Sequence, residues 1–166
     1  MKPNRLLQTG IMPALLELDG MGIPTSRNAA RFLLAIAIQE SGLAHRRQVS
    51  AGGAENGPAA SWWQGEKGGG MVTGMLNHAK TKIRMRDLCD IYNVPTDPQG
   101  IWEAIRYQDI VAAGAARLLI FTLPYSLPDT EDDGWKQYIE AWRPGRPHRE
   151  RWGPAWKLAT ETVGVV

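Results

Sequence analysis

The sequence has little cysteine, little net charge and no long apolar run, and each shortage excludes a class of protein. The single cysteine, Cys89, excludes an internal disulfide framework, and a buried apolar side chain is the ordinary role for such a residue. A formal net charge of +2 is too small to argue for nucleic acid by itself. No segment has the length and apolar character of a membrane span, so we expect no membrane-spanning helix.

Sequence patterns for metal or phosphate binding are also missing. The histidines, His45, His78 and His148, are scattered without ligand spacing, and no His-Glu-x-x-His pattern occurs. The glycines at 68–70 are not followed by the lysine and serine of a phosphate-binding loop, which favours an ordinary turn. We therefore expect neither a metal site nor a cofactor.

The first residues lack the features of an export signal. They begin with a basic side chain but contain no continuous apolar run, since Gly10 and Pro13 interrupt the apolar residues there. The sequence therefore predicts a protein that is made in the cytoplasm without a signal peptide. Its 166 residues fit one sizeable core, so we expect a single domain over residues 1–166.

The most apolar stretch, Ala29–Leu43, predicts a helix at the centre of the molecule. No polar residue interrupts Phe32–Ile38, so this helix is apolar on every face and must lie in the core. Thr25 or Ser26 can cap its start, and Gly42 is the residue type that ends a helix in the left-handed conformation.

Glu40 falls in the last turn of this helix and is the lead catalytic candidate. The negative end of the helix dipole and burial both disfavour a charged carboxylate, so both raise the pKa of the group. A glutamic acid that keeps its proton near neutral pH can serve as a general acid. The alternative is a structural role, in which Glu40 reaches solvent or pairs with Arg46 or Arg47.

The remaining chain alternates helical spacing with one segment of different character. Residues 45–70 are rich in glycine, with two tryptophans in the middle, which predicts the wall and floor of a cleft with two or three short strands. One or two short amphipathic turns are expected within residues 6–18, and helices near residues 71–78, 82–92, 130–142 and 156–163. A long helix is expected to start at Pro98 and to end before Pro124. The fold class is therefore mainly α: a helical domain around one buried helix, with a glycine- and tryptophan-rich small β insertion.

The insertion gathers the side chains that a polysaccharide site requires. Glu55 and Glu66 lie within it, and Trp62, Trp63 and Gln64 lie between them. Sugar rings stack on aromatic faces, their hydroxyl groups need polar partners, and glycoside cleavage uses an acid with, in many enzymes, a second carboxylate. Adjacent residues often face opposite ways, so one of the two tryptophans can instead belong to the core.

Three short motifs resemble those of lytic transglycosylases and goose-type lysozymes in the lysozyme-like superfamily. Residues 40–42, Glu-Ser-Gly, resemble the Glu-Ser motif that ends the catalytic helix of that family. Residues 61–64, Ser-Trp-Trp-Gln, stand at the spacing of its Gly-Leu-Met-Gln motif and keep only the final Gln. Residues 141–145, Ala-Trp-Arg-Pro-Gly, are similar to its Ala-Tyr-Asn-x-Gly motif on a late helix. The resemblance covers about residues 28–145.

The resemblance implies roles for individual residues. Goose-type lysozymes carry acidic residues two positions after the motif Gln and nine positions before it, which correspond here to Glu66 and Glu55. By similarity Glu40 is the general acid, and Glu66 and Glu55 position or activate a water molecule. The expected substrate-binding residues are Ser41, Gln64 and Trp142 by similarity, with Trp62 and Trp63 as sugar platforms and Tyr107 as a residue that can face the cleft.

The resemblance also implies a function. We expect a muramidase that cleaves the β-1,4 bond between N-acetylmuramic acid and N-acetylglucosamine in bacterial peptidoglycan. Such a small protein looks like a bacteriophage or prophage product, an endolysin or a virion-associated lysin, acting in the periplasm or cell wall with other virion proteins as further partners. Two alternatives stay open: a lytic transglycosylase that forms 1,6-anhydro ends, and a non-catalytic virion structural or wall-binding protein on the same scaffold. A nucleic-acid binder is disfavoured by the modest charge and the lack of a recognition motif.

Overall fold

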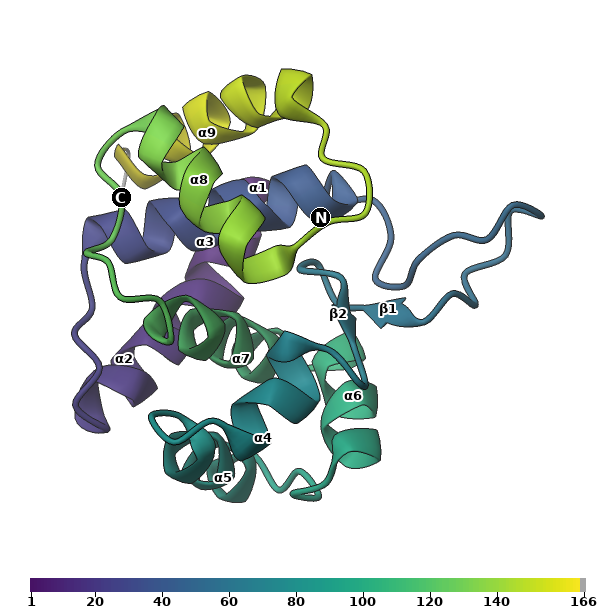
Figure 1. The fold of residues 1–166 in the computed structure, drawn as a ribbon, viewed down its shortest axis with the longest axis vertical. Coiled ribbons are helices and arrows are strands. Elements are labelled where there is room, and N and C mark those ends of the chain that lie inside the picture. The colour runs from purple at the N-terminus through teal and green to yellow at the C-terminus, as the bar shows by residue number, and fades with distance from the viewer. Residues whose placement is uncertain (165–166) are drawn as a thin grey trace.

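A computed structural model describes residues 1–164, which fold mainly into α-helices with one small antiparallel sheet (Figure 1). The expectation of a mainly α protein is therefore confirmed. The buried apolar side chains of these residues form one cluster that draws on helices from both ends of the chain. Cys89 is completely buried in it, as expected. None of the helices within residues 1–164 combines the length and the apolar character that crossing a membrane requires.

Helix α3 (Arg27–Ser41) is the buried helix that the sequence predicts. Ser26 caps it, because its hydroxyl oxygen accepts a hydrogen bond from the backbone N–H of Ala29 at 3.1 Å. Gly42 ends it in the left-handed conformation, with φ +56°. The side chains from Phe32 to Ala37 are fully buried. In Figure 1, α3 lies between α8 and α9 on one side and α7 on the other.

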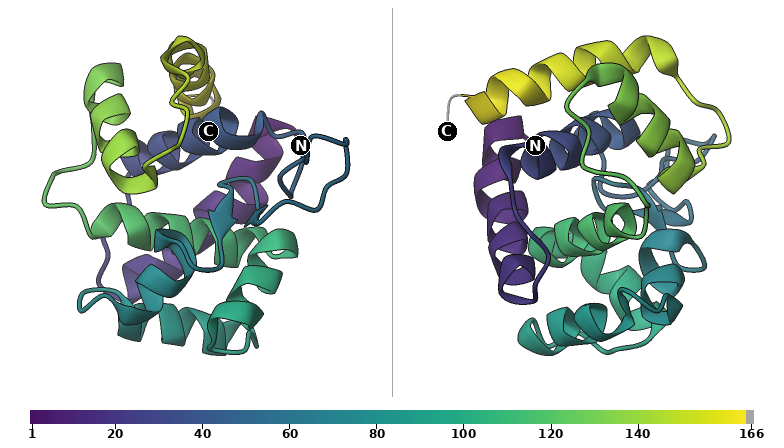
Figure 2. Two further views of the ribbon diagram at one scale, coloured as in Figure 1. Left: turned by 45° about the vertical axis from the view of Figure 1, so that its right-hand side comes forward. Right: turned by 60° about the vertical axis from the view of Figure 1, so that its left-hand side comes forward.

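The N-terminal segment is helical almost throughout and crosses α3 (Figure 2). Apart from the exposed Leu16, its leucine and isoleucine side chains are buried, and the segment packs against α7 and α3, which explains why this short amphipathic sequence is ordered. Its elements are α1 (Pro3–Leu6), the π-helical turn η1 (Leu7–Ile11) and α2 (Met12–Gly20).

The glycine-rich segment forms a small hairpin, as predicted. Strand β1 (Ala59–Ala60) pairs antiparallel with β2 (Gly65–Glu66), and an isolated bridge adds Arg47 opposite Ala60. Residues 61–64, the second motif, form the turn between the strands, and both Ser61 and Gln64 have positive φ. Before β1 the chain makes a loop that projects away from the helices (Figure 1).

The helices after the hairpin form the half of the molecule opposite α3, α8 and α9 (Figure 1). They are η2 (Gly70–Gly74), α4 (Met75–Asn77), α5 (Lys82–Ile91), α6 (Pro98–Tyr107) and α7 (Asp109–Phe121). The expectation of a single long helix from Pro98 to a point before Pro124 is wrong. The backbone of Gln108 is extended (φ −98°, ψ 92°), so the chain changes direction there and begins α7 at Asp109.

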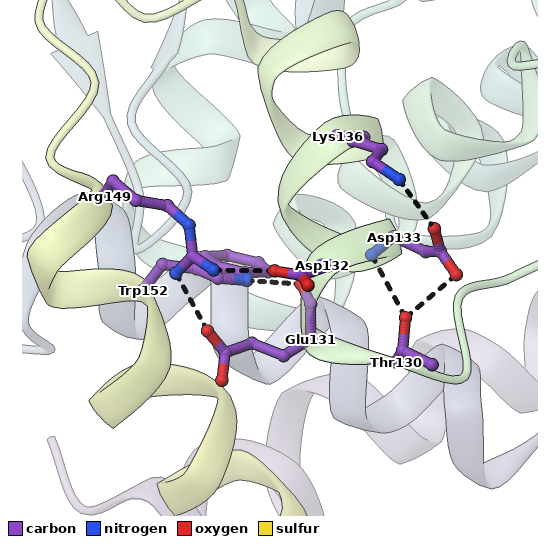
Figure 3. Close-up of polar contacts among 7 residues, drawn as sticks. All are labelled: Thr130, Glu131, Asp132, Asp133, Lys136, Arg149 and Trp152. Carbon is purple, nitrogen blue, oxygen red and sulfur yellow. Dashed lines mark hydrogen bonds and ion pairs between the residues drawn. The ribbon is translucent and has the colours of Figure 1, made fainter.

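The last two helices, α8 (Glu131–Trp142) and α9 (Arg149–Gly164), pack against each other, and α9 packs along α3. Figure 3 shows how the start of α8 is held: Arg149 donates hydrogen bonds to Glu131 at 2.8 Å and Asp132 at 2.9 Å, and the indole N–H of Trp152 bonds the Glu131 carbonyl at 2.9 Å. Helix α9 begins earlier than predicted and contains Pro154, because burial of Trp152 stabilises its first turns.

Candidate active site

A cavity of about 470 Å³ lies between the end of α3, the hairpin and the segment that follows α8. Gly69–Met71 and Leu119 of α7 complete its wall. The polar and aromatic side chains that line it include Glu40, Gln48, Gln64, Glu66, Trp142 and Arg146. The cavity therefore combines carboxyl, amide, aromatic and cationic groups from segments that are far apart in the sequence.

Glu40 is half-buried at the end of α3 and lines this cavity. Burial raises the pKa of Glu40, because the low-polarity surroundings penalise the charged form. A hydrogen bond from Tyr138 and the positive charge of Arg151 act in the opposite direction, with smaller effects. The net result is a carboxyl group that holds its proton to higher pH than an exposed glutamate.

Tyr138 is the closest polar partner of Glu40, and sequence reasoning missed it. Its hydroxyl group donates a hydrogen bond to Oε1 of Glu40 at 2.5 Å. The ring stacks on Trp152, with centroids 5.2 Å apart and planes 11° from parallel. Burial and the neighbouring carboxylate both raise the pKa of Tyr138, so its hydroxyl group remains a donor. Its place four residues before Trp142, on the same face of a helix, was an available signal.

Gln64 and Glu66 reach the cavity from the hairpin. Gln64 has the left-handed conformation (φ +51°), and its side-chain amide donates to the Ser61 carbonyl at 2.8 Å, which fixes the end of the turn. Glu66 lies on β2, opposite Ala59, and is exposed to solvent. The cavity thus has one sheltered carboxyl group, Glu40, and one solvated carboxyl group, Glu66.

Trp142, the last residue of α8, joins the third motif to the second. Its indole N–H donates to the Trp63 carbonyl at 3.0 Å, so the end of α8 is tied to the hairpin turn. The ring is half-buried and lines the cavity. One residue from each of the three motifs, Glu40, Gln64 and Trp142, therefore borders the same cavity.

Two of the expected site residues, Glu55 and Ser41, do not line this cavity. Glu55 is exposed on the projecting loop, with its carboxylate 3.0 Å from the imidazole of His45, and it lies outside the cavity. Ser41 uses its hydroxyl group to bond the Ala37 carbonyl at 2.8 Å within α3. Neither residue is among those that line the cavity of Glu40.

Both tryptophans of the second motif are buried. Trp63 is completely buried, and its indole N–H donates to the Leu33 carbonyl of α3 at 2.9 Å. Trp62 is 5% exposed and lies beneath the guanidinium of Arg46, which is 4.4 Å from the ring centre. Arg46 in turn binds Asp109 at the start of α7. These two rings anchor the hairpin to the helices and do not line the cavity.

Tyr107 is exposed in a different hollow on α6, which it shares with Trp102 and Arg47. A third hollow, between the other two, is bordered by Trp102, Arg47 and also Glu66. The three hollows share lining residues and so follow one another along the hairpin and α6. Tyr107 therefore does not line the Glu40 cavity.

Two arginines at the rim of the cavity were not among the expected site residues. Arg143 has a left-handed backbone that ends α8, and both it and Arg146 are exposed and line the cavity. The basic composition of residues 143–151 was the signal in the sequence. Within residues 1–164, no three His, Cys, Asp or Glu side chains are grouped so that they could hold a metal ion.

No protein-family model, curated protein or solved structure matches the chain. The chemistry of the site is therefore inferred from its own geometry. A sheltered carboxyl group with a raised pKa can donate a proton, and a tyrosine hydroxyl group can stabilise the carboxylate that remains. A second, solvated carboxylate in the same cavity can act on water or on a developing positive charge.

Proposed function

We propose that the protein is a muramidase that cleaves the β-1,4 bond between N-acetylmuramic acid and N-acetylglucosamine in bacterial peptidoglycan. The observation that carries this proposal is the pairing of Glu40, whose pKa is raised by burial, with Glu66 in one cavity. Glycoside hydrolysis needs this combination: one acid protonates the leaving oxygen, and a second carboxylate acts at the other face of the sugar.

The side chains around the cavity have separate roles in this mechanism. Glu40 donates its proton to the glycosidic oxygen, and the hydrogen bond from Tyr138 stabilises the carboxylate that is left. Glu66 orients the attacking water or stabilises the positive charge that develops on the sugar ring. Trp142 offers an aromatic edge or face, and Gln64 an amide, to the sugar that occupies the cavity.

The proposed relationship to the lysozyme-like superfamily is supported by the convergence of its three motifs. Glu40, Gln64 and Trp142 come from three separated segments and border the same cavity. A helical protein built around one buried helix that ends in the acid, with a small hairpin beside it, is compatible with that superfamily. The departures lie in the second motif, where the two tryptophans are buried, and in the third motif, which has Trp142 and Arg143 where the family has Tyr and Asn.

A lytic transglycosylase is the second candidate function. Glu40 is the sheltered carboxyl group of the cavity, whereas Glu66 is exposed, and a transglycosylase works with one catalytic carboxyl. That enzyme closes an anhydro ring in place of adding water. Mass analysis of the products distinguishes the two, because 1,6-anhydro-N-acetylmuramic acid ends are formed by a transglycosylase and are absent after hydrolysis.

A zymogram on purified peptidoglycan tests the proposal, with the wild type beside Glu40→Gln, Glu66→Gln and Glu55→Gln. Removing a general acid costs about 10²–10⁴-fold in rate, so Glu40→Gln should lose clearing while its circular dichroism stays native. Glu66→Gln should also clear more slowly. Glu55→Gln is the matched control, because Glu55 lies outside the cavity, and it should clear like the wild type.

Two outcomes would contradict the proposal. Equal clearing by the wild type and Glu40→Gln would remove Glu40 from the mechanism. Absence of clearing by the wild type on walls of several chemical types would instead favour a non-catalytic virion or wall-binding protein on this scaffold. In that case, sedimentation of the protein with insoluble peptidoglycan would distinguish a wall-binding protein from a purely structural one.

A further inference from the structure

A second cavity, of about 820 Å³, lies apart from the one that Glu40 lines, and the two share no lining residue. It is open to solvent and is bordered by the turn between α2 and α3, the residues around the start of α5, the C-terminal part of α7 and the segment 123–127. In Figure 1 these segments lie on the side of the molecule away from the β-hairpin. The proposed glycosidase activity assigns no role to this cavity.

Arg117 of α7 is the unusual group that lines this cavity. It is only 4% exposed, its Nη2 donates to the Pro24 carbonyl at 3.3 Å, and its Nε has no hydrogen-bond partner. No carboxylate within residues 1–164 forms an ion pair with it. Burial lowers the pKa of Arg117 to about 10, so it still carries its charge at neutral pH. A buried, unpaired cation is costly, and an anion bound in the cavity would offset that cost.

Two further cations line the same cavity. Arg84 is held in place by hydrogen bonds to the Met21 carbonyl at 3.1 Å and the Lys80 carbonyl at 2.9 Å, and Lys80 itself borders the cavity. The guanidinium groups of Arg84 and Arg117 lie 5.7 Å and 5.8 Å from the ring centre of Phe121. No acidic side chain of the described residues lines the cavity, and Asp19 approaches its edge, where its Oδ1 accepts a hydrogen bond from the backbone N–H of Thr25 at 3.1 Å.

The start of α3 adds to this positive field. Thr25 and Ser26, the residues directly before the first turn of α3, also line the cavity. The N-terminus of a 15-residue helix carries a partial positive charge and favours an anion nearby. The unpartnered Nε of Arg117 and the helix terminus are independent features, and Arg117 lines the same cavity as Thr25 and Ser26.

We propose that this cavity is a binding site for an organic phosphate. Three cations suit a phosphate monoester, which carries about 1.5 to 2 negative charges near pH 7 and accepts paired hydrogen bonds from arginine. A single carboxylate would leave most of the charge unbalanced. The cavity is much larger than one phosphate group, and its apolar residues offer contact to an attached aromatic or aliphatic body: Ile120, Phe121, Leu123 and Leu127.

Calorimetric titration of the intact protein with phenyl phosphate, inorganic phosphate and benzoate tests this proposal. Phenyl phosphate should bind, and both inorganic phosphate and benzoate should bind at least about tenfold more weakly, a difference of about 1.4 kcal/mol. Glu40→Gln should bind phenyl phosphate like the wild type, because the two cavities share no residue. This readout does not depend on glycosidase activity.

Substitutions of the cationic residues test whether phenyl phosphate binds in this cavity. Arg84→Gln and Lys80→Gln should each weaken phenyl phosphate binding about tenfold. Arg86→Gln and Lys82→Gln are the matched controls, because both residues are exposed on the same helix and neither lines the cavity, and they should leave binding unchanged. Arg117→Met, used only if its circular dichroism is native, should abolish binding.

Three results would overturn the proposal. One is absence of phenyl phosphate binding at millimolar concentration. Another is an equal loss of binding in the control variants, which would indicate general attraction to a basic surface. The third is inorganic phosphate binding as tightly as phenyl phosphate, which would exclude the contact with an organic body.

Discussion

At Glu40, burial and hydrogen bonding act on one pKa in opposite directions, and burial has the larger effect. The hydrogen bond from Tyr138 favours the carboxylate, while the surrounding protein favours the neutral acid. Such a balance suits a group that must hold a proton before the reaction and accept a charge after it. The effect of the hydrogen bond on the pKa of Glu40 can be separated from that of burial by removing the hydroxyl group of Tyr138.

Tyr138→Phe removes the hydroxyl group and keeps the ring that stacks on Trp152. Because the lost hydrogen bond lowers the pKa of Glu40, that pKa should rise further in the variant. A general acid stops working when it loses its proton, so the alkaline limb of the profile of kcat/KM against pH should move to higher pH. Tyr125→Phe, at an exposed tyrosine outside the Glu40 cavity, is the control. An unchanged limb, or a shift to lower pH, would exclude this role for Tyr138.

The raised pKa of Glu40 also predicts how stability depends on pH. In the unfolded chain the group ionises near its ordinary value of 4.5, whereas in the folded protein it ionises at higher pH. Relative to Glu40→Gln, the wild type should therefore lose stability as the pH rises from about 4.5 through the folded pKa, and the difference should then level off. Urea unfolding of both proteins over this range measures the difference. A difference that grows with rising pH would contradict the direction of the shift.

The sequence could predict the position of Glu40 at the end of a buried helix, but not its hydrogen-bond partner Tyr138. The position of Glu40 follows from local rules, since a continuous apolar run and a terminal glycine fix where the helix ends. Tyr138 lies 98 positions away, and the packing of α8 on α9, which itself packs along α3, brings it close. Trp62 and Trp63 both turn inward because they lie in a tight turn between strands, where the alternation of an extended chain does not apply.

At the scale of elements, the helices were predicted better than their boundaries. The positions of α3, α5 and α8 follow from apolar periodicity and capping residues, and the structure confirms them. The break at Gln108 has no breaker residue, because it arises from tertiary contacts: Arg46 holds the Asp109 carboxylate and also bonds the Arg106 carbonyl. Pro154 is a helix breaker that packing overrides, since Trp152 just before it is fully buried.

The position of α8 depends on its close approach to α9 at Gly134. A Cβ atom at Gly134 would lie 2.5 Å from Cζ3 of Trp156, so Gly134→Ala must push the two helices apart. Such overpacking costs about 1–3 kcal/mol, which thermal unfolding would detect as a lower Tm. Because Tyr138 and Trp142 lie on the same helix, clearing of peptidoglycan should fall as well.

Gly20→Ala is the matched control for this prediction. Gly20 is the last residue of α2, no atom lies within 4 Å of a Cβ built there, and alanine is the better helix former. The control should therefore unfold at the same temperature as the wild type or slightly above it, with full activity. A native Tm in Gly134→Ala would show that α8 and α9 can separate without cost.

At the scale of the whole molecule, α7 lies between the two cavities. Leu119 faces the cavity of Glu40, and Arg117, Ile120 and Phe121 face the second cavity. An α-helix advances about 100° per residue, so neighbouring positions on one buried helix can line opposite spaces. The run of small residues earlier in α7, at 112–116, allows this helix to pack closely on its neighbours. The packing of α7 in the core therefore separates the two cavities and also fixes the positions of the residues that line them.

A contiguous core predicts cooperative unfolding of the whole chain. The tryptophans lie in the hairpin, α6, α8 and α9, whereas α2 and α5 contain none, so fluorescence and far-ultraviolet circular dichroism report on different parts of the molecule. Hydrogen bonds from Trp63 to α3 and from Trp142 to the hairpin turn connect these parts. The two signals should give the same midpoint in urea, because packing is shared across the core. A fluorescence change at lower urea concentration than the circular dichroism change would contradict this prediction. The hairpin and the last two helices would then unfold as a separate unit, and the Glu40 cavity would be lost while α2 and α5 remained folded.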